Sequence, residues 1–369
     1  MSVNVEDYRE ELVAAAPELA EHLDALVHEA ARYLSPRGMS EYLDGARAFA
    51  RLKKEPALVV AWLDEMPEVV REVGEDVVRD VATAVLKLAS MTSGSVLTLI
   101  IETLPLAARR LGDADMLRAY LQLLHRTAAK APRGLRPMLE VLEELLSKLT
   151  LSGLRKWIDF GAQAYRRDFA RQAEYFGLKS EDSKAVLQQE RKGTLFIDVQ
   201  RKINFYLRAF WGRDFFLRPA SADLEGFRPY IEARALHLPD AVDDIGEVSG
   251  LELYRAMAAH MAAHLVYTDA PQGDAEMLSP AQRFFIGLAE DARVEYCAGS
   301  EFPGMKTLWK RLLPAADDGH AHEHRGMPLI EAMVRHLLLP EAPTGDAAVD
   351  AIIARFHEEV PGRDLDTTF

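Results

Sequence analysis

Cysteine is almost missing from this chain of 369 residues, because Cys297 is the single one. One thiol can form neither an intrachain disulfide nor a zinc or iron–sulfur site of the kinds that use several cysteine ligands. A disulfide-stabilised secreted protein is therefore excluded, and a reducing compartment, the cytoplasm, is expected. Cys297 lies next to Tyr296 in a helical pattern with no histidine nearby, which predicts a core residue and not a nucleophile.

Long hydrophobic runs are also missing. The longest, Val96–Ile101, is ended by Glu102, whereas a membrane-spanning helix needs about 20 apolar residues. The first residues, Met1–Arg9, include two acidic side chains and lack the apolar segment of a secretion signal. The sequence therefore predicts no membrane span and no export.

Positive charge is scarce, since 44 Lys and Arg face 58 Asp and Glu, giving a net charge of −14. A surface of this sign repels phosphate, and no segment gathers basic and aromatic residues, so nucleic acid is not expected as a partner. The motifs GxxxxGK[ST], GxGxxG and GxSxG are absent as well. We therefore expect that the chain neither hydrolyses ATP itself nor uses a serine nucleophile.

Amphipathic helices fill the N-terminal half of the sequence. From Tyr8 to about Tyr175, apolar residues recur at intervals of three and four between short breaks rich in Gly, Pro, Ser and Asp. From Ser93 to Asp168 the helices recur about every 20 residues, so that a helix pair recurs about every 40, the spacing of HEAT or armadillo repeats. Residues 1–180 are thus predicted to form a HEAT-like helical repeat scaffold in a mainly α protein, with an irregular helical bundle as the alternative.

The pattern changes after Gly177. Residues 181–311 are predicted to form a mixed helical domain, with a short β-hairpin where polar and apolar residues alternate over Phe227–Leu236. Well-marked helices are expected over Leu251–Tyr267 and Pro280–Ala298, the second with Ser279 as its N-cap. Residues 312–369 carry four basic and eleven acidic side chains. We interpret them as an acidic connecting region with helices over Pro328–Leu339 and Ala347–Glu359.

One set of residues has the spacing of a metal site. His260 and His264 lie one turn apart on the same face of a predicted helix, and a carboxylate from the next helix, Glu290 or Glu295, could complete a shell for zinc. The alternative is a metal-free polar network in which both histidines pack against the carboxylates and Arg293.

A metal-dependent hydrolase centred on His260, His264 and Glu290 is disfavoured. In the zincin pattern the residue after the first histidine is a glutamate that acts as general base, but here it is Met261. The tract His320–His324 also contains three histidines, and we interpret it as a solvated part of the acidic connector, with metal capture as the alternative.

Arginines cluster at expected helix ends, in Arg109–Asp113, Arg133–Pro137 and Arg166–Asp168. Basic side chains near a helix C-terminus compensate the helix dipole. The alternative is that they line one edge of the scaffold and bind an acidic partner.

Several segments together resemble the CbbO subunit of the CbbQO rubisco activase and its NorD relatives. The segments, joined by the His260/His264 and Glu290–Glu295 pair, are Met91–Ser95, Leu104–Asp113, Ala131–Met138, Gln189–Phe196, Tyr206–Arg213 and Arg228–Ile231. The resemblance covers nearly the whole chain, and the long helical N-terminal region favours CbbO over the shorter NorD proteins.

The resemblance implies a non-catalytic adaptor of a MoxR-class AAA+ ATPase. In the CbbO branch the CbbQ ring hydrolyses ATP, and CbbO directs it to inhibited rubisco so that tightly bound sugar phosphates are released. In the NorD branch an analogous pair matures nitric oxide reductase. The resemblance therefore implies two partners, a CbbQ-like hexamer and a client enzyme, with rubisco as the expected client and nitric oxide reductase as the alternative of the NorD branch.

The sequence departs from this family at its C-terminal end. Such adaptors end in a von Willebrand factor A domain with a DxSxS metal motif, whereas this chain ends at Phe369 without it. We expect either that the chain is a fragment or that the second half is encoded separately. Ring binding is the part of the family's function that carries over more directly, because client docking depends on a domain whose motif this sequence lacks.

Overall fold

The computed structural model describes residues 4–191, 193–220, 229–268, 278–315, 327–338 and 344–360. The chain divides into two compact units, which we describe separately. Unit 1 is Met1–Lys192 with Pro219–Glu225, and unit 2 is Gly193–Arg218 with Gly226–Phe369. The described residues form 18 α-helices and five short strands, so the prediction of a mainly α protein is confirmed.

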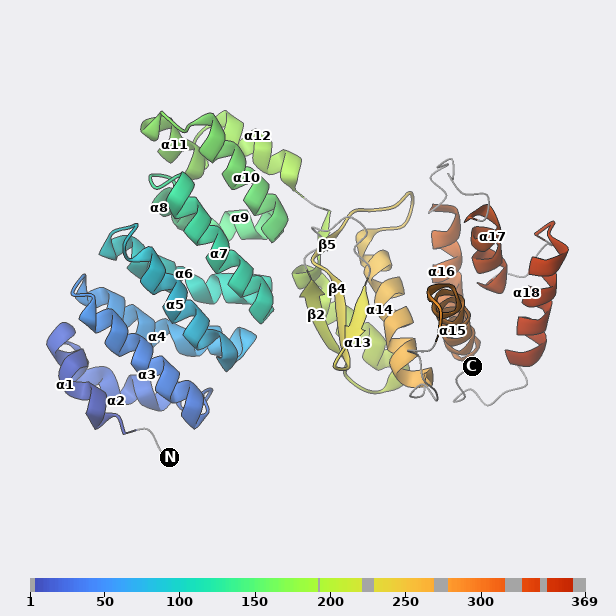
Figure 1. Ribbon diagram of the computed structural model, residues 1–369, viewed down its shortest axis with the longest axis horizontal. Coiled ribbons are helices and arrows are strands. Elements are labelled where there is room, and N and C mark those ends of the chain that lie inside the picture. Colours follow the sequence, from blue (N-terminus) through green and yellow to red (C-terminus); the bar gives the residue numbers. More distant parts are fainter. Residues whose placement is uncertain are drawn as a thin grey trace. The chain divides into compact units, whose positions relative to one another are not determined.

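Unit 1 consists of helices packed in two rows (Figure 1), in which contacts run along each row and also join the rows to each other. The first row is α1 (Glu6–Ala15), α3 (Pro36–Arg51), α5 (Val78–Leu88), α7 (Ala114–Lys130), α10 (Leu151–Ala164) and α12 (Glu181–Glu190). The second row is α2 (Leu19–Ala30), α4 (Pro56–Val73), α6 (Gly94–Leu111), α8 (Leu135–Glu140), α9 (Leu142–Lys148) and α11 (Phe169–Phe176), and a 3-10 turn, η1 (Glu75–Val77), precedes α5. The HEAT-type repeat itself stays a prediction, because two rows of helices do not by themselves define that repeat.

The interface of α3 with α4 shows how the rows are joined. Pro67 lies inside α4, so it has no N–H for the carbonyl of Leu63 one turn earlier. The buried Tyr42 hydroxyl of α3 donates a hydrogen bond to that carbonyl, and Trp62 Nε1 returns one to the Tyr42 carbonyl at 2.8 Å. The next helix of the row, α6, carries Pro105 at the same position of an 18-residue helix. The backbone group that proline frees is thus used to bind one row to the other.

An acidic cluster on α4 makes the stability of unit 1 depend on pH. Burial first, and then the charges of Asp64, Glu68 and Glu102, raise the pKa of Glu65 to about 7. Since the folded state holds a proton that the unfolded state releases near pH 4.5, stability falls as pH rises from 4.5 to 7. Replacing Glu65 by Gln should therefore stabilise unit 1 by about 1 kcal/mol at pH 8, after solvent screening of a partly exposed group, and have little effect at pH 4.

Urea denaturation at both pH values measures this effect. Glu72→Gln on the same helix is the matched control, because Glu72 is not among the charges that raise the pKa of Glu65 and its carboxylate is paired with Arg71 at 3.0 Å, so its loss should give no gain. Equal effects of Glu65→Gln at pH 4 and pH 8 would contradict the assignment of the raised pKa.

Unit 2 begins with two small sheets. β1 (Thr194–Leu195) pairs antiparallel with β5 (Ala241–Val242) and leads into α13 (Phe196–Trp211). A three-stranded sheet has the order β2 (Phe216–Ala220), β4 (Ala235–Pro239), β3 (Tyr230–Glu232). β3 and β4 form an antiparallel hairpin in which Ile231 faces Leu236, so the predicted hairpin is confirmed. Its turn places Ala233 and Arg234 at positive φ, as a tight two-residue hairpin requires.

The rest of unit 2 is helical. Its helices are α14 (Gly250–Tyr267), α15 (Pro280–Glu301), α16 (Pro303–Ala315), α17 (Met327–Leu338) and α18 (Ala347–Glu359). The main core joins α13, the sheet, α14, α15 and α16, and it contains Cys297, which is buried as predicted. A smaller apolar cluster joins α15 to α17 and α18. The region predicted as an acidic connector thus supplies two helices that pack on α15.

The sequence-based boundary at residue 180 falls between α11 and α12. Both helices pack against α10, and the division between the units lies at Lys192. Among the helices that the structure describes, none combines the length and apolar character needed to cross a bilayer.

Candidate functional site

Two neighbouring helices of unit 2, α14 and α15, carry the histidines and carboxylates singled out by the sequence. Both begin with a complete capping box, Ser249 with Glu252 on α14 and Ser279 with Gln282 on α15. Pro280 occupies the first turn of α15, as the sequence predicted. The two helices pack directly on each other. Side chains at intervals of four residues therefore form facing stripes along the contact.

His260 and His264 lie together on α14, as predicted, with ring centroids 5.0 Å apart and ring planes nearly perpendicular at 77°. The Nε2 atom of His264 is 3.0 Å from Oδ1 of Asp291 on α15, and Nε2 of His260 is 3.7 Å from the same oxygen. One potential ligand atom from each of the three residues lies within 4.8 Å of the others. The residue that meets both imidazoles is thus Asp291, which the sequence analysis had not chosen.

Glu295 lies beside this trio. Its Oε1 is 2.9 Å from Nδ1 of His260, on the opposite side of the ring from Asp291. Burial of the ring alone lowers the pKa of His260, but the hydrogen bond to Glu295 and the charges of Glu295 and Asp291 outweigh burial and raise that pKa above its ordinary value. Glu295 therefore orients and polarises the His260 ring.

Glu290 points elsewhere. Its carboxylate accepts two hydrogen bonds from Arg293, both 2.8 Å, and a third of 2.6 Å from the Thr268 hydroxyl. Arg293 is buried, and its Nη2 also donates to the Tyr267 carbonyl at 2.6 Å. Glu290 reaches the histidines only through Thr268, whose Oγ1 is 3.3 Å from Nδ1 of His264. Of the four predicted residues, the structure brings together His260, His264 and Glu295. Glu290 is linked to His264 through the Thr268 hydroxyl.

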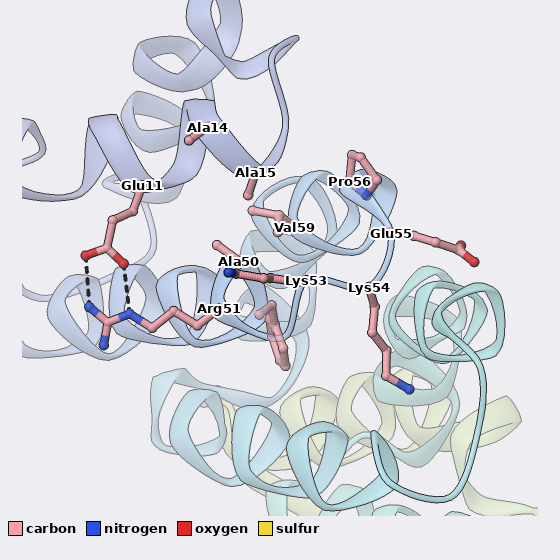
Figure 2. Close-up of a pocket in the computed structure, with 11 residues that line it drawn as sticks. Glu11, Ala14, Ala15, Ala50, Arg51, Lys53, Lys54, Glu55, Pro56 and Val59 are labelled. Carbon is pink, nitrogen blue, oxygen red and sulfur yellow. Dashed lines mark hydrogen bonds and ion pairs between the residues drawn. The ribbon is translucent and has the colours of Figure 1, made fainter.

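The described grooves of unit 1 carry a different kind of surface. Figure 2 shows a depression of about 470 Å³ between the end of α1 and the loop that joins α3 to α4. Its floor is small and apolar, with Ala14, Ala15 and Val59, and at its edge Arg51 forms a bidentate ion pair with Glu11, both bonds 2.8 Å. Nothing in this depression groups a nucleophile with a base.

Two further grooves follow the first row of unit 1. One of about 360 Å³ lies between α5 and α7, and one of about 720 Å³ between α7 and α10. Ion pairs bridge the same helices, and the second groove adds the exposed Arg166 to its lining. The bridging pairs are Asp80 with Arg118, Asp159 with Arg126 and Lys130, and, from α10 to α12, Lys156 with Glu190. These partly exposed pairs contribute only about 0 to 1 kcal/mol each, so their main effect is to place charges along the row.

The tract His320–His324 lies outside the described residues. No family model, curated protein or solved structure matches the chain.

Proposed function

We propose that this chain is a non-catalytic, cytoplasmic adaptor that binds a MoxR-class AAA+ ATPase ring and directs it to a client enzyme, and that the client is rubisco. The observation that carries the proposal is the set of sequence segments that resembles CbbO, from Met91–Ser95 to Arg228–Ile231. The release of inhibitory sugar phosphates would then be driven by ATP hydrolysis in the ring.

The surface of unit 1 supports a protein partner over a small substrate. Grooves follow its first row, and Arg126, Lys130 and Arg166 line the one of about 720 Å³ between α7 and α10. Basic side chains around a mixed polar groove suit a protein surface of opposite charge, because charge complementarity selects the partner and speeds its association. We therefore place ring docking on the α7–α10 groove.

The first test mixes the full chain with the MoxR-class ATPase from the same organism. Co-elution on a sizing column and an altered ATPase rate are expected. Failure of both, with an ATPase preparation shown to be active, would overturn the proposed function.

A matched pair of variants then tests the docking surface. Lys130→Glu with Arg166→Glu reverses charge in the α7–α10 groove, and co-elution should be lost. Arg71→Glu with Arg136→Glu makes the same change in charge on the second row, on α4 and α8, and should retain binding. The reverse result would move the docking surface to the second row.

The identity of the client enzyme distinguishes a CbbO-type function from a NorD-type function. Recovery of activity by inhibited rubisco in the presence of chain, ring and ATP is the expected result. A NorD-type maturation factor, the alternative, would leave rubisco inhibited and raise the yield of active nitric oxide reductase.

A metal-dependent hydrolase is the second candidate, because two imidazoles and a carboxylate meet on a partly exposed surface. Two features oppose it. Met261 occupies the position of the zincin general base, and Glu290 is held by Arg293 and Thr268. Turnover in a peptide-substrate screen that is lost in Glu290→Gln would reverse this ranking.

A further inference from the structure

The outer contacts of the two histidines engage their Nδ1 atoms and leave both Nε2 atoms facing Asp291. A carboxylate only accepts, so Glu295 requires a proton on Nδ1 of His260. The Thr268 hydroxyl donates its one hydrogen bond to Glu290, whose carboxylate also accepts two hydrogen bonds from Arg293. The hydroxyl oxygen can then accept a hydrogen bond from Nδ1 of His264 in the tautomer that carries its hydrogen on that atom.

In this tautomer both Nε2 atoms present lone pairs to the same carboxylate. His264 Nε2 and His260 Nε2 lie 3.0 and 3.7 Å from Oδ1 of Asp291. Three acceptors converge there, an arrangement that is repulsive unless a cation lies among them. A metal ion among these three atoms would bind all of them at once, whereas without one His264 Nε2 carries the hydrogen and donates it to Asp291 in the other tautomer.

The separations fit a metal ion. Ligands bound to a tetrahedral zinc ion at its usual bond lengths lie about 3.4 Å from one another. The two measured separations bracket that value, and all three ligand atoms lie within 4.8 Å. Asp291 is 51% exposed, which leaves a further coordination position open to solvent.

We propose that His260 Nε2, His264 Nε2 and a carboxylate oxygen of Asp291 bind a zinc ion that links α14 to α15. Two imidazoles one turn apart and one carboxylate are a ligand set that zinc accepts readily, whereas Mg²⁺ and Ca²⁺ prefer oxygen ligands alone. This site differs from the sequence-based set, since Asp291 replaces Glu290 as a ligand and Glu295 becomes an outer partner.

The outer residues act as positioning residues. Glu295 holds His260 by Nδ1, and Thr268 with Glu290 holds His264 in the same way. Such hydrogen bonds fix the orientation of ligand rings and raise their basicity. The ion would join two helices that also meet in the core of unit 2, independently of any ATPase partner.

The test uses the full chain purified without an affinity tag, with His320, His322 and His324 replaced by Ala so that this tract cannot bind the ion. One zinc per chain is expected, removable by a chelator and restored on titration. Co²⁺ in its place should give the visible absorption of a tetrahedral site. Chelation should lower the melting temperature, because an ion that binds the folded state stabilises it by mass action.

Variants in the same background identify the ligands. Asp291→Asn and His264→Gln should each weaken zinc binding by more than about 100-fold, and Glu295→Gln by roughly 10- to 100-fold. His22→Ala, which changes an exposed histidine of α2, should bind zinc normally. A purely structural role for Glu295 would lower the melting temperature and leave zinc affinity unchanged.

Asp291→Asn is the deciding variant, because its side chain is half-exposed and nearly the same shape, and circular dichroism verifies its fold. Zinc should raise the melting temperature of the parent and leave that of Asp291→Asn unchanged. No saturable zinc binding by the parent, or equal affinity in Asp291→Asn, would overturn the site. Neither outcome bears on ring binding, which the co-elution test decides separately.

Discussion

Replacing Arg293 by Met is expected to lower the free energy of unfolding of unit 2 by about 3 to 5 kcal/mol. The Arg293 side chain is only 2% exposed, and Glu290 only 12%. Without the guanidinium, the Glu290 carboxylate keeps a single hydrogen bond, from Thr268, and the Tyr267 carbonyl loses its donor. A buried charge without its partner is among the most costly defects in a protein.

Hydrogen exchange resolved to peptides measures this effect in α14 and α15, with a chelator present so that metal does not contribute. Arg283→Met is the matched control, because it removes an exposed arginine from the same helix and should change stability by less than about 0.5 kcal/mol. The double variant Arg293→Met with Glu290→Leu should regain part of the loss, since no charge is then left buried. A loss below about 1 kcal/mol in Arg293→Met would show that water reaches Glu290.

Replacing Trp157 by Ala should destabilise unit 1 by about 3 to 5 kcal/mol. Trp157 is fully buried in α10 and stacks on Tyr175 of α11 with ring centroids 4.8 Å apart. Its Nε1 donates to the Ser183 carbonyl of α12 at 3.0 Å, while the Tyr175 hydroxyl donates to the Trp157 carbonyl at 2.9 Å. One side chain therefore joins three helices, and its removal leaves a cavity among them.

Trp157→Phe separates the contribution of ring packing from that of the Nε1 hydrogen bond. It keeps an aromatic ring beside Tyr175 but removes the hydrogen bond from Nε1 to the Ser183 carbonyl. The Ser183 carbonyl lies within α12, so it keeps its helical donor, and a loss of about 1 kcal/mol, less than that of Trp157→Ala, is expected. Urea denaturation together with exchange in α10, α11 and α12 checks both variants. Equal losses in Trp157→Ala and Trp157→Phe would mean that the hydrogen bond, and not packing, holds these helices together.

The helices were predictable where local signals agreed. The Ser279 cap followed by Pro280 marked the start of α15, and the alternation near Tyr230 marked the hairpin. The sequence predicted no interruption at Val141, where the chain ends α8 and starts α9. Nor did it predict the pairing of β2 with the hairpin, because strand pairing depends on residues distant in sequence.

The candidate site was predictable as a pair of helices but not in its ligands. Glu290 and Asp291 are neighbours, and a step of one residue turns a helix by about 100°, so the rotation of α15 decides which one faces α14. Burial of Arg293 sets that rotation, and Glu290 is buried on the same side of α15 because it is paired with Arg293. A usable signal was nevertheless present, because Asp291 and Glu295 are four residues apart, as are His260 and His264.

The two-row arrangement of unit 1 has a consequence for how this part of the chain folds. Its main contacts join helices that are neighbours or next neighbours in sequence, so most loops that must close are short. Chains dominated by such local contacts cross a low entropic barrier and fold in microseconds to milliseconds. A nucleus can form at any adjacent pair of helices and spread in both directions. Unit 1 is thus expected to fold fast and by several parallel routes.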